Sequence, residues 1–282
     1  MKFLRKMYYF SVQKIFNNIF LRHHAVEIVF QPKKTADILL LTVAFNNPRV
    51  LEWQLSLCER FLDDDHVHII LDNSSSPRAR RSNKNICLRH KAVYVSLPCN
   101  PWTGIHNSRS HGISLDWAFR YIVPHYSFQV LGLLDHDVFP IQRHSLLADM
   151  NERQYMGVLQ ERPGLWYLWP GFFFVRATNL NLSDFSMLPT RKADTGGALW
   201  RKVFCRMDKR DIFFVKEQEY RLREGASRQS SFYYRMGRHW VHTVNASYWN
   251  GCTPKENDIV NILQNEFGIV LSSDSFEMIK DF

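Results

Sequence analysis

Two acidic residues spaced two apart, at the end of an apolar run, are the strongest chemical signal in this sequence. The segment from Phe128 to Pro140 is largely apolar up to Asp135-His136-Asp137. Such a short apolar run is typical of a buried strand in an α/β sheet, and ligands bind beyond the carboxyl ends of these strands. Residues two apart on a strand share one face, roughly 6.5–7 Å apart. Asp135 and Asp137 are therefore candidate ligands for a divalent cation and its phosphate partners, because hard cations prefer oxygen donors. A solvated turn with acids placed by chance is the alternative.

Length and composition place the chain among ordinary globular proteins. It has 282 residues, 45% apolar and 22% charged, which is enough for a full core and excludes wholesale disorder. The net charge of +9 favours an anionic partner. No helix-turn-helix, zinc-finger spacing or RNP-like motif accompanies the basic residues, so nucleic acid is not expected as a partner. The five cysteines are widely spaced without a C-x-x-C pair, which indicates reduced thiols and a cytoplasmic protein.

Residues 1–35 are predicted to form a basic amphipathic helical segment. Apolar residues recur there at helical spacing, five Lys or Arg side chains occur among the first 22 residues, and the first acid is Glu27. This pattern is typical of a helix lying in an anionic membrane interface, which would hold the protein peripherally at the inner face of the plasma membrane. A helix docked on its own domain or on a twin subunit is the alternative. No apolar stretch reaches the roughly 18–20 residues that a membrane span needs.

From residue 36 onward the sequence alternates between strands and helices. Apolar strands are expected at 38–45, 67–71 and 92–97, and amphipathic helices over about 50–62 and 113–122. A polar loop follows each of these strands. This rhythm predicts an α/β fold with a Rossmann-like, mostly parallel sheet and helices on both faces.

The order of these motifs over roughly residues 36–250 resembles that of nucleotide-sugar glycosyltransferases of the GT-A fold, most of all the bacterial family 2-type enzymes. The first strand and its loop at Asn46 resemble the opening segment of that family. Asp72-Asn73-Ser74 resembles the loop that holds the nucleoside base, and Ser110-His111-Gly112 resembles the helix entry before the metal strand. Asp135-His136-Asp137 matches the D-x-D signature.

The resemblance implies a metal-dependent hexosyltransferase that uses Mn²⁺ or Mg²⁺ and a nucleotide-sugar donor. By the same resemblance, the donor is expected to be UDP-linked. In this interpretation Asp137 ligates the cation, and Asp135 contacts either the ribose or a water molecule bound to the cation. The donor-binding residues implied are Asn46, Asp72, Asn73, Ser110, His111 and Asp135. A third metal ligand is expected late in the chain, where the apolar strand Trp240–Asn245 offers His242. His239 is the local competitor, and a purely structural histidine is the alternative.

An inverting reaction also needs a base that takes a proton from the acceptor. Asp194, followed by Thr-Gly-Gly, is the first candidate, and a role as a helix N-cap is its alternative. Glu217 and Glu219 are further candidates, although the clean Glu-Asp pair of the family is missing there. The aromatic run 164–171 is expected to form a loop before a buried strand, Phe172–Val175, suited either to stacking on a sugar or to packing in the core.

The predicted organisation is an N-terminal helical segment (1–35), a GT-A-like catalytic domain (36–252) and a C-terminal helical extension (253–282). The acceptor implied by the resemblance is a glycan or a lipid-linked sugar in bacterial polysaccharide biosynthesis. Two rival functions stay open. A haloacid-dehalogenase-type phosphatase would use Asp135 as its nucleophile and Asp137 as acid and base, but three strands precede the motif here. The other rival is a non-catalytic module that binds glycans or nucleotide sugars.

Overall fold

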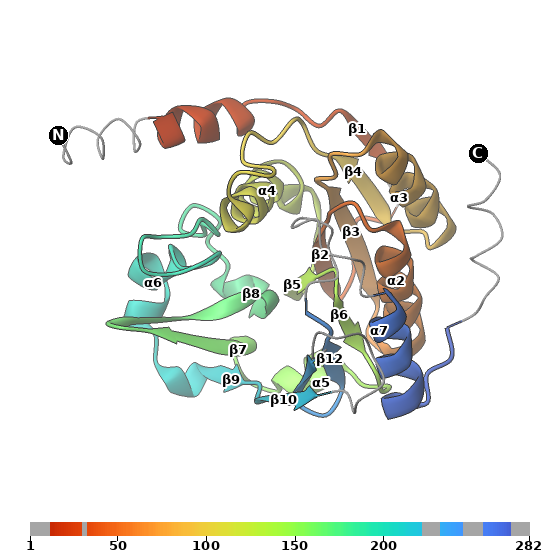
Figure 1. Cartoon of the computed structure of the whole chain (residues 1–282). Helices are drawn as coiled ribbons and strands as arrows, with labels where there is room; N and C mark the ends of the chain where they lie inside the picture. The colour runs from red at the N-terminus through yellow and green to blue at the C-terminus, as the bar shows by residue number, and fades with distance from the viewer. Residues whose placement is uncertain (1–11, 30–32, 222–231, 245–255, 272–282) are drawn as a thin grey trace.

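The computed structural model describes residues 12–29, 33–221, 232–244 and 256–271, which form two β-sheets with helices packed around them (Figure 1). Within these residues the larger sheet has eight strands in the order β1-β4-β3-β2-β5-β8-β7-β9, and the smaller sheet has four in the order β10-β11-β12-β6. The strands of the larger sheet are β1 (Glu27–Val29), β2 (Ile38–Ala44), β3 (His66–Asp72), β4 (Val93–Ser96), β5 (Val130–Asp135), β7 (Tyr155–Arg162), β8 (Leu165–Arg176) and β9 (Ile212–Phe214). Those of the smaller sheet are β6 (Val138–Pro140), β10 (Glu217–Arg221), β11 (Phe232–Met236) and β12 (Trp240–His242).

Strands β4, β3, β2 and β5 run parallel at the centre of the larger sheet, as predicted. The register places Ala44 beside Asp72 and Val43 beside Asp135, so the carboxyl ends of these strands meet at one edge. Strand β8 is antiparallel to both β5 and β7, and β1 is antiparallel to β4. The sheet is therefore mixed toward its margins, and its parallel part carries the polar strand ends.

Helices cover both faces of the parallel strands, which confirms the predicted α/β architecture (Figure 1). Helices α2 (Pro48–Phe61) and α3 (Pro77–Arg89) pack on one face, and α4 (Asn107–Tyr121) packs on the other. Alternate residues of each strand point toward the two helical layers, because side chains alternate along a strand. Continuous apolar runs in β2 and β3 follow from this burial on both sides.

The aromatic run before Phe172 forms a strand, in contrast to the predicted loop. Strand β8 begins at Leu165 and pairs with β7, but the register shifts between Gly157 and Leu159. Gly157 lies opposite Phe173 and Leu159 opposite Leu168, so residues 169–172 form a bulge. Pro170 lies in this bulge, where its missing N–H does not interrupt a regular ladder. Glycine and proline in this run therefore mark an irregular strand and not a loop.

The smaller sheet is joined directly to the acidic turn. Strand β6 begins immediately after Asp137 and pairs with β12, with Val138 opposite His242 and Trp240 opposite Pro140. Strand β11 completes an antiparallel hairpin with β12. The predicted strand at Trp240–Asn245 is thus present over its first three residues, and residues 245–252 lie outside the described part of the chain.

The N-terminal segment is helical over 12–20, and β1 follows at Glu27–Val29. The helix therefore does not extend through the whole predicted range of 1–35, and residues 1–11 lie outside the described part. Phe20 is buried against the core shared with α4, whereas Ile15 and Ile19 are half-exposed. No helix among the described residues is both long enough and apolar enough to cross a membrane.

The described part of the predicted C-terminal extension shares the core of the domain. Helix α7 (Glu256–Asn261) and the π-helical turn Ile262–Glu266 contribute Ile259, Ile262 and Leu263 to an apolar cluster. This cluster also includes residues of α2 and of strands β6, β11 and β12. Helix α7 thus lies beside α2 in Figure 1. Residues 272–282 lie outside the described part of the chain.

Candidate active site

A cavity of about 450 Å³ opens at the carboxyl ends of β2, β3 and β5. Its position is the one expected for a ligand site in an α/β sheet. Most of the residues predicted for the site line it. They are Asn73, Ser110, His111, Asp135, Asp137, Asp194, Glu217 and His242. The structure therefore brings together side chains up to 169 positions apart in the sequence, from Asn73 to His242.

The turn that carries the two acids is fixed by hydrogen bonds to its backbone. The Gln54 side-chain amide donates to the carbonyl oxygens of Asp135 (2.7 Å) and Val138 (2.9 Å). The backbone N–H of Thr243 donates to the carbonyl oxygen of Asp137 (3.0 Å), as does its hydroxyl (3.2 Å). Asp137 is buried, with 6% of its surface exposed. The two carboxylates are thus held on a turn anchored from two sides.

Gln54 is itself held by a buried polar chain beneath the turn. The Thr42 hydroxyl donates to the side-chain oxygen of Gln54 (3.1 Å) and lies 2.9 Å from Nε2 of His68. Burial lowers the pKa of His68 to about 3, so its ring is neutral at physiological pH. A neutral ring can donate from Nε2 to the Thr42 oxygen while the hydroxyl donates to Gln54. The orientation of the Gln54 amide is therefore fixed by its neighbours.

His242 lies beside Asp137, as the prediction of a third metal ligand requires. Its Nε2 is 3.5 Å from Oδ1 of Asp137, and its ring packs 4.6 Å from the ring of Trp169. The Nδ1 atom of His242 is buried and makes no hydrogen bond to the described residues. His239, the competing candidate, lies at the other end of β12 and does not line the cavity.

The charges around Asp135 favour binding of a cation. Burial and then the neighbouring charge of Asp137 raise the pKa of Asp135 to about 6. His111 lies on the other side, with its Nε2 3.4 Å from Oδ1 of Asp135. Burial lowers the pKa of His111 to about 4, although the charges of Asp137 and Asp194 oppose this shift. His111 therefore supplies a neutral ring and does not neutralise the two acids at physiological pH.

The acidic turn offers ligand types that divalent cations bind, although the ligand atoms of Asp135, Asp137 and His242 do not all lie within 4.8 Å of one another. Two carboxylates and one imidazole nitrogen are available from Asp135, Asp137 and His242, and such mixed oxygen and nitrogen sets suit Mn²⁺ better than Ca²⁺. A cation at the turn would also offset the mutual repulsion of the partly exposed Asp135 carboxylate and the buried Asp137 carboxylate. The cavity beside these residues has room for the oxygens of a diphosphate, which a cation held there would contact.

Two other predicted donor-binding residues lie on the cavity wall in a shared network. The Asn73 amide donates to the Ser110 hydroxyl (2.9 Å), and its oxygen accepts a hydrogen bond from Asn100 (3.1 Å). Asn100 also donates to the carbonyl oxygen of Ser110 (3.0 Å). This network ties the end of β3 to the first turn of α4 and fixes two polar groups at the cavity surface.

Asn46 and Asp72 do not line the cavity, in contrast to the prediction. The Asp72 carboxylate is fully buried and accepts hydrogen bonds from the Ser74 N–H (2.9 Å) and the Tyr94 hydroxyl (2.9 Å). The side-chain oxygen of Asn46 accepts from the backbone N–H groups of Ser75 and Ser76, both at 3.1 Å. Both side chains hold the loop after β3, because short polar side chains satisfy tight turns as readily as ligands.

Two of the three candidate bases, Asp194 and Glu217, line the cavity at different places. Asp194 precedes the short helix α6 (Leu199–Lys202), whose N-cap position is occupied by Ala198 without a side-chain hydrogen bond. Asp194 is therefore not the cap of this helix. Glu217 is the first residue of β10 and lies at the rim, where desolvation raises the pKa of its carboxyl group. Glu219 lies further along β10, bonded to Arg221 and Tyr234, and does not line the cavity.

Arg162 is a functional candidate that carries no clear signal in the sequence, whereas Tyr167 and Trp169 belong to the aromatic run considered above for stacking on a sugar. The hairpin of β7 and β8 contributes Arg162, Tyr167 and Trp169 to the cavity wall. Arg162 adds a positive charge that suits a phosphate, and the bulge in β8 directs Trp169 toward His242. Gly171 makes this possible, because a Cβ at that position would lie 2.1 Å from the Trp169 ring. The proline and glycine of Trp169-Pro170-Gly171 mark this bulge in the sequence.

No family model and no curated protein matches the sequence. Among solved structures, the mannosyltransferase PcManGT from Pyrobaculum calidifontis, in complex with GDP-Man and Mn²⁺, is similar at a TM-score of 0.39 and 10% identity, covering 61% of this chain and 52% of that chain. The mannosyltransferase Ktr4p from S. cerevisiae has a TM-score of 0.33 at 12% identity (58% and 64% covered), and LgtC has 0.33 at 16% identity (51% and 57%). The chain spans less than two thirds of each of these structures. Likeness at this level carries no argument about function, which rests on the site itself.

Proposed function

We propose that the protein is a glycosyltransferase that moves a sugar from a nucleotide-diphosphate donor to a hydroxyl group of a glycan or lipid-linked acceptor. The observation that carries this proposal is the convergence of Asp135, Asp137 and His242 at one end of a 450 Å³ cavity. Mn²⁺ or Mg²⁺ bound there would stabilise the negative charge on the departing diphosphate. We propose a UDP-linked donor, and membership of the family 2-type enzymes stays a prediction.

In this proposal the remaining cavity residues bind and orient the substrates. Asn73 and Ser110 present polar groups at the end of β3 for the nucleoside, and Arg162 attracts the diphosphate. His111 is neutral and can offer a hydrogen bond beside Asp135. Trp169, which is partly exposed, provides a flat apolar surface on which a sugar ring can stack, and the buried Tyr167 packs in the core beside it. These residues come from both sides of the sheet end, which suits a donor lying across it.

Asp194 is the proposed base. The acceptor oxygen forms a bond to the anomeric carbon, the bond from that carbon to the phosphate oxygen breaks, and the acceptor proton passes to the Asp194 carboxylate. Glu217 is the second candidate, because it also faces the cavity and its raised pKa favours proton uptake. A location at an anionic membrane surface is part of the proposal, and the exposed Ile15 and Ile19 support it.

The test compares donor binding and turnover in the protein and in Asp137→Asn. A panel of nucleotide diphosphates is screened by thermal shift with Mn²⁺ and with EDTA, and hydrolysis of the matching nucleotide sugar is then measured. Asp137→Asn should lose most metal-dependent binding, whereas the exposed control Asp184→Asn should behave as the wild type. Unchanged binding in Asp137→Asn contradicts the metal role. Hydrolysis of a simple phosphomonoester in place of the nucleotide sugar would indicate a phosphatase, and binding without turnover on any acceptor would indicate a non-catalytic module.

A further inference from the structure

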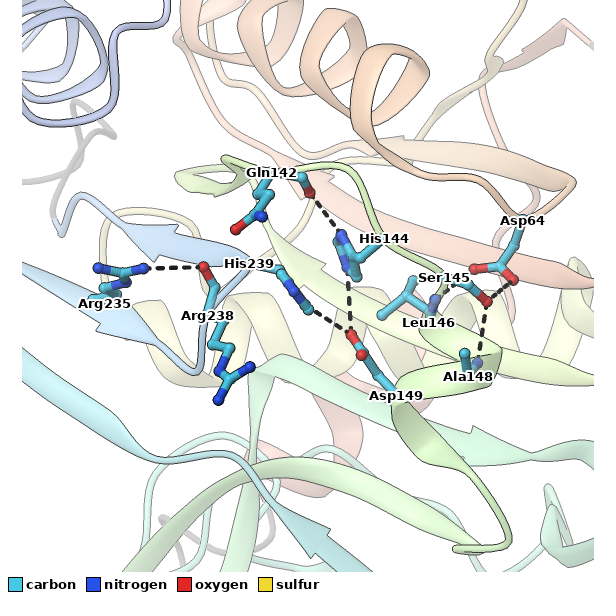
Figure 2. Close-up of polar contacts among 10 residues, drawn as sticks. All are labelled: Asp64, Gln142, His144, Ser145, Leu146, Ala148, Asp149, Arg235, Arg238 and His239. Carbon is cyan, nitrogen blue, oxygen red and sulfur yellow. Dashed lines mark hydrogen bonds and ion pairs between the residues drawn. The ribbon is translucent and has the colours of Figure 1, made fainter.

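A second group of potential metal ligands lies at the far end of the β6–β12 pair from the acidic turn (Figure 2). It consists of His144, Asp149 and His239, here called the His-Asp-His cluster. His144 follows β6, Asp149 lies in the short helix α5 (Leu146–Met150), and His239 immediately precedes β12. Three separate segments therefore converge on one point outside the cavity described above.

The donor atoms of the cluster are at distances that fit one small ion. Nδ1 of His239 is 3.1 Å from Oδ2 of Asp149, and Nε2 of His144 is 3.8 Å from the same oxygen. The three ligand atoms all lie within 4.8 Å of one another. Ligand atoms 2.0–2.2 Å from a tetrahedral zinc ion are roughly 3.3–3.6 Å apart. The two distances to Asp149 lie on either side of this range, so small side-chain rotations suffice to bind an ion.

The tautomer of His144 is fixed by its other ring nitrogen. Nδ1 lies 2.9 Å from the backbone carbonyl oxygen of Gln142 (Figure 2). A carbonyl oxygen only accepts hydrogen bonds, so Nδ1 carries a proton and the neutral ring presents a lone pair at Nε2. A histidine that donates one N–H to a backbone carbonyl and binds metal with its other nitrogen is the usual arrangement in metal sites.

The Nε2 atom of His144 is left facing the Asp149 carboxylate without a hydrogen-bond partner among the described residues. The side chain of His144 is buried, with 3% of its surface exposed. A lone pair against a carboxylate oxygen is repulsive unless a cation lies between them. The cation would be a proton or a metal ion. The His239 ring stacks 4.5 Å away from the His144 ring and adds a second nitrogen next to the same carboxylate, which favours a metal ion shared by all three.

We propose that the His-Asp-His cluster binds a divalent transition-metal ion such as Zn²⁺, distinct from the cation at the acidic turn. Two imidazole nitrogens and one carboxylate are ligands that zinc prefers. Asp149 and His239 are partly exposed, at 28% and 24% of their side-chain surfaces, which leaves a route for the ion and a position for a bound water. The site is structural, because it joins the β11–β12 hairpin to the segment after β6.

The proposed ion reinforces a contact that already exists in the backbone. The Ile141 N–H donates to the carbonyl oxygen of His239 (2.8 Å), which holds the start of β12 against the end of β6. His242, at the other end of the three-residue strand β12, lies beside Asp137. Binding of metal at His239 therefore restrains the strand that presents His242 to the cavity. The proposal does not rest on the glycosyltransferase function, because the ligands and the test are separate from the acidic turn.

The test uses the full chain carrying Asp137→Asn, freed of metal with a chelator, so that the acidic turn does not contribute. Zn²⁺ is titrated by calorimetry, and Co²⁺ is followed by its visible absorption, which reports tetrahedral coordination. We expect one Zn²⁺ per chain and a rise in Tm on binding. Adding His239→Asn should weaken Zn²⁺ binding by at least about tenfold, because even the loss of an outer-shell partner costs 10–100-fold.

A matched control and a second variant make the test decisive. His90 forms a similar pair with Glu59 at 3.1 Å but belongs to no group of three metal-ligand residues in the described part of the chain, so His90→Asn should leave Zn²⁺ binding unchanged. If His239→Asn fails to fold, Asp149→Asn replaces it, because asparagine still accepts the hydrogen bond from His239. The proposal is overturned if the Asp137→Asn protein binds no Zn²⁺ or Co²⁺. It is also overturned if the cluster variant binds Zn²⁺ as tightly as the His90→Asn control.

Discussion

Replacing Gln54 by methionine should loosen the acidic turn while preserving the volume of the core. Gln54 is fully buried, and its amide group donates to the carbonyl oxygens of Asp135 and Val138. Methionine has a similar length and flexibility but no N–H group. In the variant two carbonyl groups lose their donor and the Thr42 hydroxyl loses its acceptor, so the packing of α2 is retained while the hydrogen bonds to the turn are lost.

The magnitude follows from the number of groups left without a partner. Each buried polar group without a hydrogen bond costs about 1–3 kcal/mol, so the two carbonyl groups and the Thr42 hydroxyl together predict a fall of about 3–9 kcal/mol in the free energy of unfolding. This is a large share of the about 5–15 kcal/mol that stabilises a typical domain. The same turn carries Asp137, so affinity for Mn²⁺ with a nucleotide diphosphate should also fall, by about tenfold for each 1.4 kcal/mol lost from binding.

Two measurements and one control separate positioning of the turn from general loss of stability. Urea unfolding gives the free energy of unfolding, and calorimetry gives the affinity for a nucleotide diphosphate with Mn²⁺. The control is Leu55→Ala, on the same helix, where removal of a buried side chain should cost about 2–5 kcal/mol without affecting the turn. We expect both variants to be less stable and only Gln54→Met to bind weakly. The reasoning is refuted if Gln54→Met binds as tightly as the wild type, or if Leu55→Ala binds as weakly as Gln54→Met.

Three further predictions concern the base, a buried acid and the N-terminal helix. Asp194→Asn should lower turnover on the order of 10²–10⁴-fold while calorimetry shows unchanged donor affinity, and normal turnover would exclude it as the base. Burial raises the pKa of Asp116 from 3.8 to about 7, so the folded protein binds more protons than the unfolded chain between these values, and the free energy of unfolding should fall as the pH rises through this window. Urea unfolding of Asp116→Asn across the same pH range should lack this part of the dependence, and an identical profile would disprove it. The double variant Ile15→Asp/Ile19→Asp should no longer co-sediment with anionic vesicles at low salt, although its unfolding should match that of the wild type. A wild-type protein that does not co-sediment with such vesicles contradicts the membrane prediction.

The central sheet and the acidic turn could be predicted because their signals are local. Strand β5 is a short apolar run buried along its length, and Asp135 ends it at the edge where β2 and β3 also end. The position of His242 could be predicted for a similar reason, since it follows two buried apolar residues in a short strand. Such patterns report which face of an element is buried, and a sheet of parallel strands then determines where their ends meet.

The contacts of individual polar side chains could not be predicted in this way. Asp72 and Asn46 follow apolar strands just as Asp135 does, yet both hold the loop after β3. Gln54 interrupts the apolar surface of α2 and looks like an ordinary helix residue in the sequence, although it anchors the acidic turn. The outcome depends on which backbone groups the fold brings near each side chain. The backbone partners are 29 and 30 residues away from Asn46 and 81 and 84 residues away from Gln54, beyond the reach of any local pattern.

What distinguishes the proposed metal-binding acids from the structural Asp72 is the part of the residue that the fold uses. The hydrogen bonds from Gln54 and Thr243 engage the carbonyl groups of the acidic turn, whereas those at Asp72 engage both carboxylate oxygens. Bonds to the backbone fix the position of a turn without using the charge that a cation requires. The smaller sheet also positions the turn. Thr243, the residue after β12, donates to the Asp137 carbonyl, and β12 itself carries His242. A single short strand thus positions both the turn and its proposed third ligand, which explains why the cavity is formed where the two sheets meet.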